Sequence, residues 1–102
     1  MTIRILRPAI EDLWSGSAFY DQRGAEVGDH FLECLYADIE SLRVTKGVHR
    51  RFEGFYRLIS ERFPFAVYYD VEGDRVDVWR VLDLRSDPGT ITRELRRTRT
   101  DG

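Results

Sequence analysis

The spacing of apolar positions along this 102-residue chain changes once, near residue 46. Before that point, apolar residues recur at three- and four-residue steps, which is the period of an α-helix. After it, they alternate with polar residues, which is the period of a β-strand. The pattern therefore predicts a helical first half and a stranded second half, without an internal repeat or a polar linker.

The first half predicts a short strand followed by two helices. Residues 2–7 alternate in polarity, and Pro8 suits the first turn of a helix because its missing N–H costs nothing there. We expect this helix to end near Asp21, with Gly24 in the left-handed conformation. A second helix carries a single apolar stripe, made of Val27, Phe31, Leu35, Ile39 and Leu42. Because the connection is short, the two helices should form an antiparallel hairpin.

The second half predicts an antiparallel β-meander. Its strands are expected at residues 55–62, 65–71 and 75–84, and the tight-turn signal at 72–74 separates the last two. The N-terminal strand is free to pair at the side of this meander. Helices on one face of an antiparallel sheet make an α+β fold, so residues 1–102 are predicted to form a single α+β domain. After Pro88 we expect a short C-terminal helix or tail, with residues 89–102 partly flexible.

Composition narrows the functional classes. Hydrophobic residues make up 42% of the chain and charged residues 33%, which is typical of a globular protein. The sequence contains no apolar stretch of membrane-spanning length and no visible secretory signal, and Cys34 has no second cysteine to pair with. We therefore expect a cytoplasmic protein.

Charge is distributed unevenly. Residues 1–42 carry a net charge of −5 and residues 43–102 a net charge of +3, and 15 of the 16 basic residues are arginine. Such asymmetry indicates either ordinary surface pairing or an anion-binding surface on the C-terminal half. Arginine suits the second role because its planar fork grips carboxylates and phosphates with two hydrogen bonds.

Arg80 is the most unusual residue of the last predicted strand. Alternation assigns Val76, Val78, Leu82 and Leu84 to one face. Arg80 falls in the middle of that face, whereas Trp79 and Val81 fall on the other. Because an unpaired buried guanidinium is very costly, Arg80 should either meet an acid or open onto a groove. A structural ion pair and a functional site both fit this position.

No motif for metal, cofactor or nucleotide binding is present. His30 and His49 are far apart, and no carboxylate or cysteine is spaced with them as a metal site requires. We therefore predict no metal site and no cofactor. The remaining candidates for binding are arginines on or next to the predicted strands, which alternate with tyrosines and Trp79 along the sequence. These arginines are Arg51, Arg57, Arg80 and Arg85. Such a surface suits either nucleic acid or a protein partner.

Three segments resemble the RelE/ParE superfamily of type II toxins. Residues 52–57, 62–69 and 78–88 are similar to the family segments "Gly-x-Tyr-Arg", "Phe-Pro-Tyr-x-Ile-Tyr-Tyr" and "Val-Leu-His-x-Arg-Arg-Asp-Pro". The resemblance covers nearly the whole chain and implies a growth-inhibiting toxin of a plasmid-stabilisation system, neutralised by a cognate antitoxin. RelE-like members cleave mRNA on the ribosome. ParE-like members inhibit DNA gyrase and are not nucleases.

Several positions depart from the RelE-like pattern. Ala66 stands where such a nuclease has an arginine, Asp83 where it often has a histidine, and Ser86 where it has the second arginine. No tyrosine follows Tyr69. The resemblance therefore favours the ParE-like branch and a binding protein rather than an enzyme.

Two alternatives stay open beside this reading. A RelE-like, metal-independent endoribonuclease would use Arg57, Arg80 and Arg85. A non-toxic interaction domain would keep only the fold. For binding of the target or partner we single out seven residues: Arg51, Arg57, Trp79, Arg80, Arg85, Trp14 and Tyr20.

Overall fold

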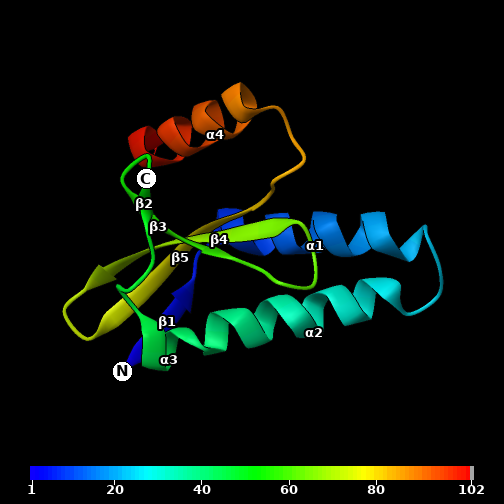
Figure 1. The fold of residues 1–102 in the computed structure, drawn as a ribbon, viewed down its shortest axis with the longest axis horizontal. Helices are drawn as coiled ribbons and strands as arrows, with labels where there is room; N and C mark the ends of the chain where they lie inside the picture. Colours follow the sequence, from blue (N-terminus) through cyan, green and yellow to red (C-terminus); the bar gives the residue numbers. More distant parts are fainter. Residues whose placement is uncertain (102) are drawn as a thin grey trace.

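The computed structural model describes residues 1–101 as a five-stranded sheet between two helical layers (Figure 1). The elements are β1 (Thr2–Ile5), α1 (Arg7–Asp21), α2 (Val27–Glu40), α3 (Leu42–Thr45), β2 (Arg51–Phe52), β3 (Phe55–Ile59), β4 (Phe65–Glu72), β5 (Arg75–Asp83) and α4 (Pro88–Asp101). The strand order is β1-β5-β4-β3-β2, and all neighbours are antiparallel except β1 and β5. The predicted α+β fold, with its helical hairpin and meander, is confirmed.

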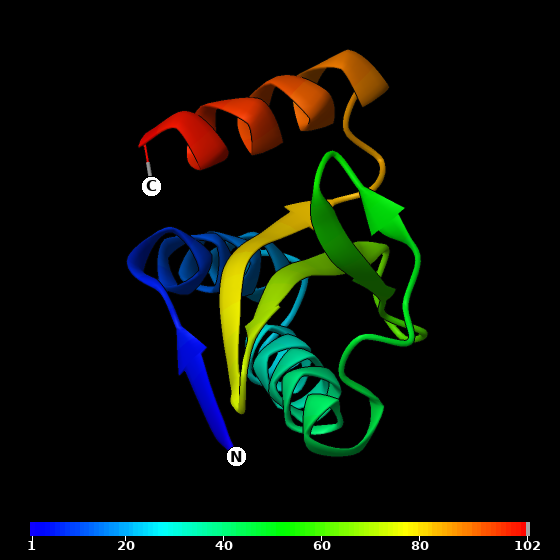
Figure 2. The ribbon, with the colours of Figure 1, turned by 90° about the vertical axis from the view of Figure 1, so that its left-hand side faces the viewer.

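The helical hairpin covers one face of the sheet, and α4 covers the other (Figure 2). The larger core lies on the hairpin face. Its buried residues are Ala9, Leu13, Phe31, Leu35, Ile39, Leu42, Phe65, Val67, Tyr69, Val76, Val78 and Val81. The predicted stripe of α2 supplies Phe31, Leu35 and Ile39 to this core, which confirms the direction in which that helix faces.

The turn between α1 and α2 differs from the expectation. Glu26, with φ of 72°, takes the left-handed conformation there, and Gly24 does not. The position of Gly28 supplies the reason, because a Cβ on this residue would collide with the Ser17 carbonyl and the Asp21 carboxylate of α1. The backbone N–H of Gly28 also donates to Asp21 Oδ1 at 3.0 Å. This close approach fixes where α2 begins, so the sharp turn falls one residue before Val27.

The second core is smaller and lies under α4. Its buried residues are Phe55, Ala66, Tyr68, Ile91 and Leu95, with Phe52, Trp79, Leu82 and Leu84 packed at its border. The helix expected around Ile91 and Leu95 is confirmed and extends to Asp101. The expected flexibility of residues 89–102 stays a prediction, and Gly102 lies outside the described residues.

A β-bulge on β5 overturns the predicted face assignment. Tyr68 of β4 pairs with Arg80, but the next residue, Tyr69, pairs with Val78, so Trp79 is the extra residue. The bulge shifts the alternation by one position. As a result Val81 joins the core on the hairpin face, whereas Leu82 and Leu84 pack under α4 together with Trp79.

A short strand that the sequence pattern did not predict begins the meander. β2 pairs with β3 through a two-residue turn in which Glu53 and Gly54 both have positive φ, 50° and 85°. Two positive φ angles are characteristic of a type I′ hairpin turn. The resulting hairpin reaches toward the C-terminal end of α4 (Figure 1). No helix in residues 1–101 is long and apolar enough to cross a membrane.

Candidate functional site

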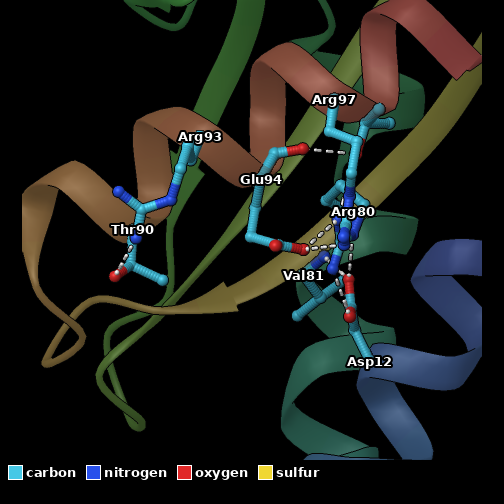
Figure 3. A network of polar contacts seen from close by, with 8 residues as sticks. Asp12, Arg80, Val81, Thr90, Arg93, Glu94 and Arg97 are labelled. Carbon is cyan, nitrogen blue, oxygen red and sulfur yellow. Dashed lines mark hydrogen bonds and ion pairs between the residues drawn. The ribbon is translucent and has the colours of Figure 1, made fainter.

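Arg80 lies where α1, β5 and α4 meet (Figure 3). β1 accompanies β5 only as far as Val78, so the following part of β5 lies beside α1 instead of a strand. Arg80 Nε and Nη2 donate to the two carboxylate oxygens of Asp12 at 2.7 and 2.9 Å. Its Nη1 donates to Glu94 Oε1 at 3.1 Å and to Thr98 Oγ1 at 3.0 Å, both on α4. Arg80 therefore joins the two helical layers through the edge of the sheet.

The Asp12 carboxylate also completes the sheet edge. The backbone N–H of Val81 donates to Asp12 Oδ2 at 2.9 Å, so the carboxylate acts where the carbonyl of a neighbouring strand would otherwise accept. The Arg80 side chain is 11% exposed and that of Asp12 is 15% exposed. The hydrogen bond to Asp12 raises the pKa of Arg80 above its ordinary value, although burial opposes this shift. Of the two alternatives predicted for Arg80, an acidic partner or a groove, the acidic partner is observed here.

A cleft of about 350 Å³ opens beside this network. It is lined by Pro8, Glu11, Asp12, Trp79, Arg80, Arg97 and Thr98. The cleft brings together two of the predicted binding residues, Trp79 and Arg80. Two of the lining residues are acidic and two are basic, so the walls carry both signs.

Arg57 and Tyr68 lie under α4, in the same row of the sheet as Arg80. The register pairs Tyr68 with Arg57 on one side and with Arg80 on the other. The Arg57 guanidinium lies 4.6 Å from the centroid of the Phe52 ring. The Tyr68 hydroxyl is buried and has no hydrogen-bond partner among residues 1–101. Burial raises the pKa of Tyr68, while nearby Arg57 acts in the opposite direction.

Arg85 belongs to a separate group at the end of β5. Its Nε and Nη2 donate to the two carboxylate oxygens of Asp83 at 3.1 and 2.9 Å, and Nη2 also lies 3.3 Å from the Tyr20 hydroxyl on α1. Burial raises the pKa of Asp83, but the hydrogen bonds from Arg85 outweigh burial, and the net pKa lies below its ordinary value. The predicted residues Arg85 and Tyr20 are thus brought together, next to Phe19.

Trp14 and Arg51 lie apart from these groups. Trp14 is 63% exposed on α1, and two further apolar side chains of the hairpin, Ile10 and Tyr36, are about two-fifths exposed, at 39% and 42%. Arg51 is exposed on β2 and donates to the Gly54 carbonyl at 2.6 Å. The seven singled-out residues therefore do not form one site.

The sequence pattern missed the partners of Arg80. Asp12, Glu94 and Thr98 complete the network, and only the four-residue spacing of Glu94 and Thr98 on a helix offered a signal that they act on the same neighbour. In the part of the chain that the structure describes, no three His, Cys, Asp or Glu side chains are placed to hold a metal ion.

Comparison with known proteins gives a fold likeness. No protein-family profile matches the chain, and no curated protein matches it. A solved structure described as "Chromosomal ParDE TA system from P. aeruginosa" contains a chain that superposes with a TM-score of 0.74 at 22% sequence identity. The likeness covers 83% of this chain and 97% of that chain. The predicted RelE/ParE-like fold is thereby confirmed.

Proposed function

We propose that this protein is the ParE-like toxin of a type II toxin–antitoxin pair. In this proposal it acts in the cytoplasm, inhibits growth by binding DNA gyrase, and is neutralised by a cognate antitoxin. The observation that carries the proposal is the fold likeness to a chain of the ParDE system, with a TM-score of 0.74. The three sequence segments that resemble the superfamily support it independently.

The state of the arginines favours a binding protein over a ribonuclease. Phosphodiester cleavage needs cationic groups that are free to stabilise the charge of the transition state. Arg80 is engaged by Asp12 and Glu94, and Arg85 by Asp83. Arg57 is the one arginine of the alternative catalytic set that forms no ion pair with the described side chains of residues 1–100.

The exposed face of the helical hairpin supports a protein partner. Trp14 is 63% exposed, and exposed aromatic side chains often dominate the energy of protein interfaces. Tyr20, Trp79 and the arginines singled out above lie on other parts of the surface. All seven remain proposed contacts, which target and antitoxin would share between them.

Controlled expression in bacteria tests the toxin proposal. We expect induction of the wild-type chain to lower the number of colony-forming cells by orders of magnitude. After induction, cells that express Trp14→Ala should form at least ten times as many colonies as cells that express the wild-type chain, because the substitution removes the largest exposed apolar side chain. Val44→Ala is the matched control, since Val44 is 89% exposed on α3, away from α1. Unaffected growth with correctly folded, abundant protein would favour the non-toxic interaction domain.

A second candidate function rests on one specific observation. Arg57, which forms no ion pair, lies beside the buried Tyr68 hydroxyl on the face under α4, an arrangement that could serve phosphodiester chemistry if α4 moved. Primer extension on cellular mRNA after induction distinguishes the two candidates. New cleavage sites that disappear with Arg57→Ala would replace the gyrase proposal with the ribonuclease.

A further inference from the structure

Two guanidinium groups converge on one backbone carbonyl at the tip of the β2–β3 hairpin. Arg51 Nη2 and Arg99 Nη2 each donate to the Gly54 carbonyl oxygen at 2.6 Å. One arginine comes from β2 and the other from the last turn of α4, so the site depends on the fold rather than on one segment. Figure 1 shows the C-terminal end of α4 beside this hairpin.

Neither arginine has a carboxylate partner among residues 1–100, whose side chains the structure describes. The nearest acid to the hairpin tip is Glu53, which pairs with Arg96 at 2.9 Å. A second acid, Asp70, lines a pocket together with Arg99 but forms no ion pair with it, so three arginines face two carboxylates in this region. Each guanidinium carries five N–H donors, and Arg51 and Arg99 each make one hydrogen bond in the structure. Both side chains are exposed, so their remaining donors are open to a ligand.

Aromatic rings hold both guanidinium groups in place. Arg51 lies over Tyr56 and Arg99 over Phe55, each 4.5 Å from the ring centroid. Such stacking fixes the plane of a guanidinium while it leaves the N–H edge free. The two forks are therefore preorganised, which lowers the entropic cost of binding an anion.

Gly54 makes the convergence possible. Its φ of 85° belongs to the left-handed region that favours glycine, and a Cβ at this position would lie 2.5 Å from Arg99 Nη2. Glycine therefore suits the turn, and the absence of a side chain leaves room for the Arg99 guanidinium beside the carbonyl.

We propose that Arg51 and Arg99 form a binding site for a phosphate group, with Arg96 at its rim. The N–H donors of one guanidinium suffice for the two oxygens of a carboxylate. A phosphate group has more acceptor oxygens, so two guanidinium groups that approach it together suit it better. The source is either a free phosphate compound or the phosphodiester backbone of a nucleic acid. This site goes beyond the proposed function, which assigns Arg51 to a protein partner and gives Arg99 no role.

Thermal unfolding with sodium pyrophosphate, matched in ionic strength with sodium chloride, tests the proposal. We expect pyrophosphate to raise the Tm of the wild-type chain more than chloride does, since a ligand that binds the folded state stabilises it. Arg51→Gln and Arg99→Gln should each weaken the apparent affinity about tenfold, because each removes a charged fork. Arg93→Gln is the control. It removes one exposed arginine of α4 whose side chain bonds to Thr90 within the same helix, and it should leave the affinity unchanged.

A second measurement separates the two sources. Fluorescence anisotropy of a labelled twelve-nucleotide oligo(dT) should show weaker binding for Arg51→Gln and Arg99→Gln than for Arg93→Gln if the phosphodiester backbone is bound. If Arg51→Gln and Arg99→Gln weaken the binding of pyrophosphate but not that of oligo(dT), the source is a free phosphate compound. Equal losses in all three variants, or an equal effect of chloride, would overturn the proposal in favour of diffuse charge. A glutamate peptide that competes as well as pyrophosphate would overturn the choice of phosphate.

Discussion

The two faces of the sheet differ in how they are covered. On the hairpin face, α1 and α2 bury twelve core residues, among them Phe31 and Leu35. On the opposite face, α4 buries five core residues, and a charged network at the sheet edge ties this helix to the rest of the chain. The first face is therefore stabilised mainly by apolar burial, whereas the second depends on a small core together with hydrogen bonds to Arg80.

This difference separates the parts of the molecule that determine its fold from those available for function. The hairpin face places its apolar residues inside, but its outer surface still exposes Trp14. The α4 face stacks Arg57 and Arg99 on aromatic rings and leaves the Tyr68 hydroxyl unpaired. A buried unpaired polar group costs about 1–3 kcal/mol, so the packing under α4 carries this penalty at Tyr68, as the packing of α2 does at Asp38.

A matched pair of leucines should show the largest effect. Leu35 on α2 and Leu95 on α4 are both fully buried, so truncation to alanine removes the same atoms on opposite faces. We expect Leu35→Ala to lower the free energy of unfolding by about 4 kcal/mol, and Leu95→Ala by about 2 kcal/mol, because the small core can collapse around the lost atoms. Urea denaturation followed by circular dichroism measures both values. Equal losses would remove the distinction between the faces.

The Asp12–Arg80 pair should show the next largest effect. Asp12→Ala leaves Arg80 mostly buried with Glu94 as its remaining acid and leaves the Val81 N–H without its acceptor, so we expect a loss of about 3 kcal/mol. Arg80→Met should cost a similar amount, because it leaves the Asp12 charge unpaired. The double variant should lose less than the sum of the two. Additive losses in a double-mutant cycle would mean that Asp12 and Arg80 are not coupled, and therefore that this pair does not tie α1 to β5.

Part of the structure could be predicted from the sequence for physical reasons. Helical and strand periods are local properties, so the stripe of α2 and the strands β3, β4 and β5 follow from spacing alone. β2 was missed because two residues are too few to show a period. The bulge at Trp79 was missed because it arises from the pairing of β5 with β4, and it moved Val81 and Leu82 to faces opposite to those predicted.

The candidate site was predictable only in outline. The position of Arg80 among apolar residues predicted either an acidic partner or a groove. The acidic partner is observed, and its identity depends on how α1 passes the open edge of β5. The convergence of Arg51 and Arg99 joins residues 48 positions apart, and no local pattern carries that information.

The smallest expected effect concerns pH. Asp77 lies on the face opposite the hairpin, where the hydrogen bond from Arg4 lowers its pKa below the ordinary value; burial opposes this and Arg75 adds to it. Since the folded-state pKa lies below the unfolded value of about 3.9, the stabilising contribution is complete above that pH and is lost as the pH falls through the folded-state pKa.

Asp77→Asn should therefore be less stable than the wild-type chain at pH 6, and the difference should shrink below about pH 4. Urea denaturation at pH 6 and pH 3 measures the two differences. A difference that stays constant across this range would show that the charge of Asp77 does not contribute.

The most direct test of the functional account is a supercoiling assay with purified gyrase and relaxed plasmid. The account predicts that the wild-type chain inhibits supercoiling in a concentration-dependent way, that Val44→Ala inhibits equally, and that Trp14→Ala needs about tenfold more protein for the same inhibition. Full supercoiling at a large excess of folded wild-type chain, together with new mRNA cleavage sites in induced cells, would contradict the account and assign the protein to the ribonuclease branch.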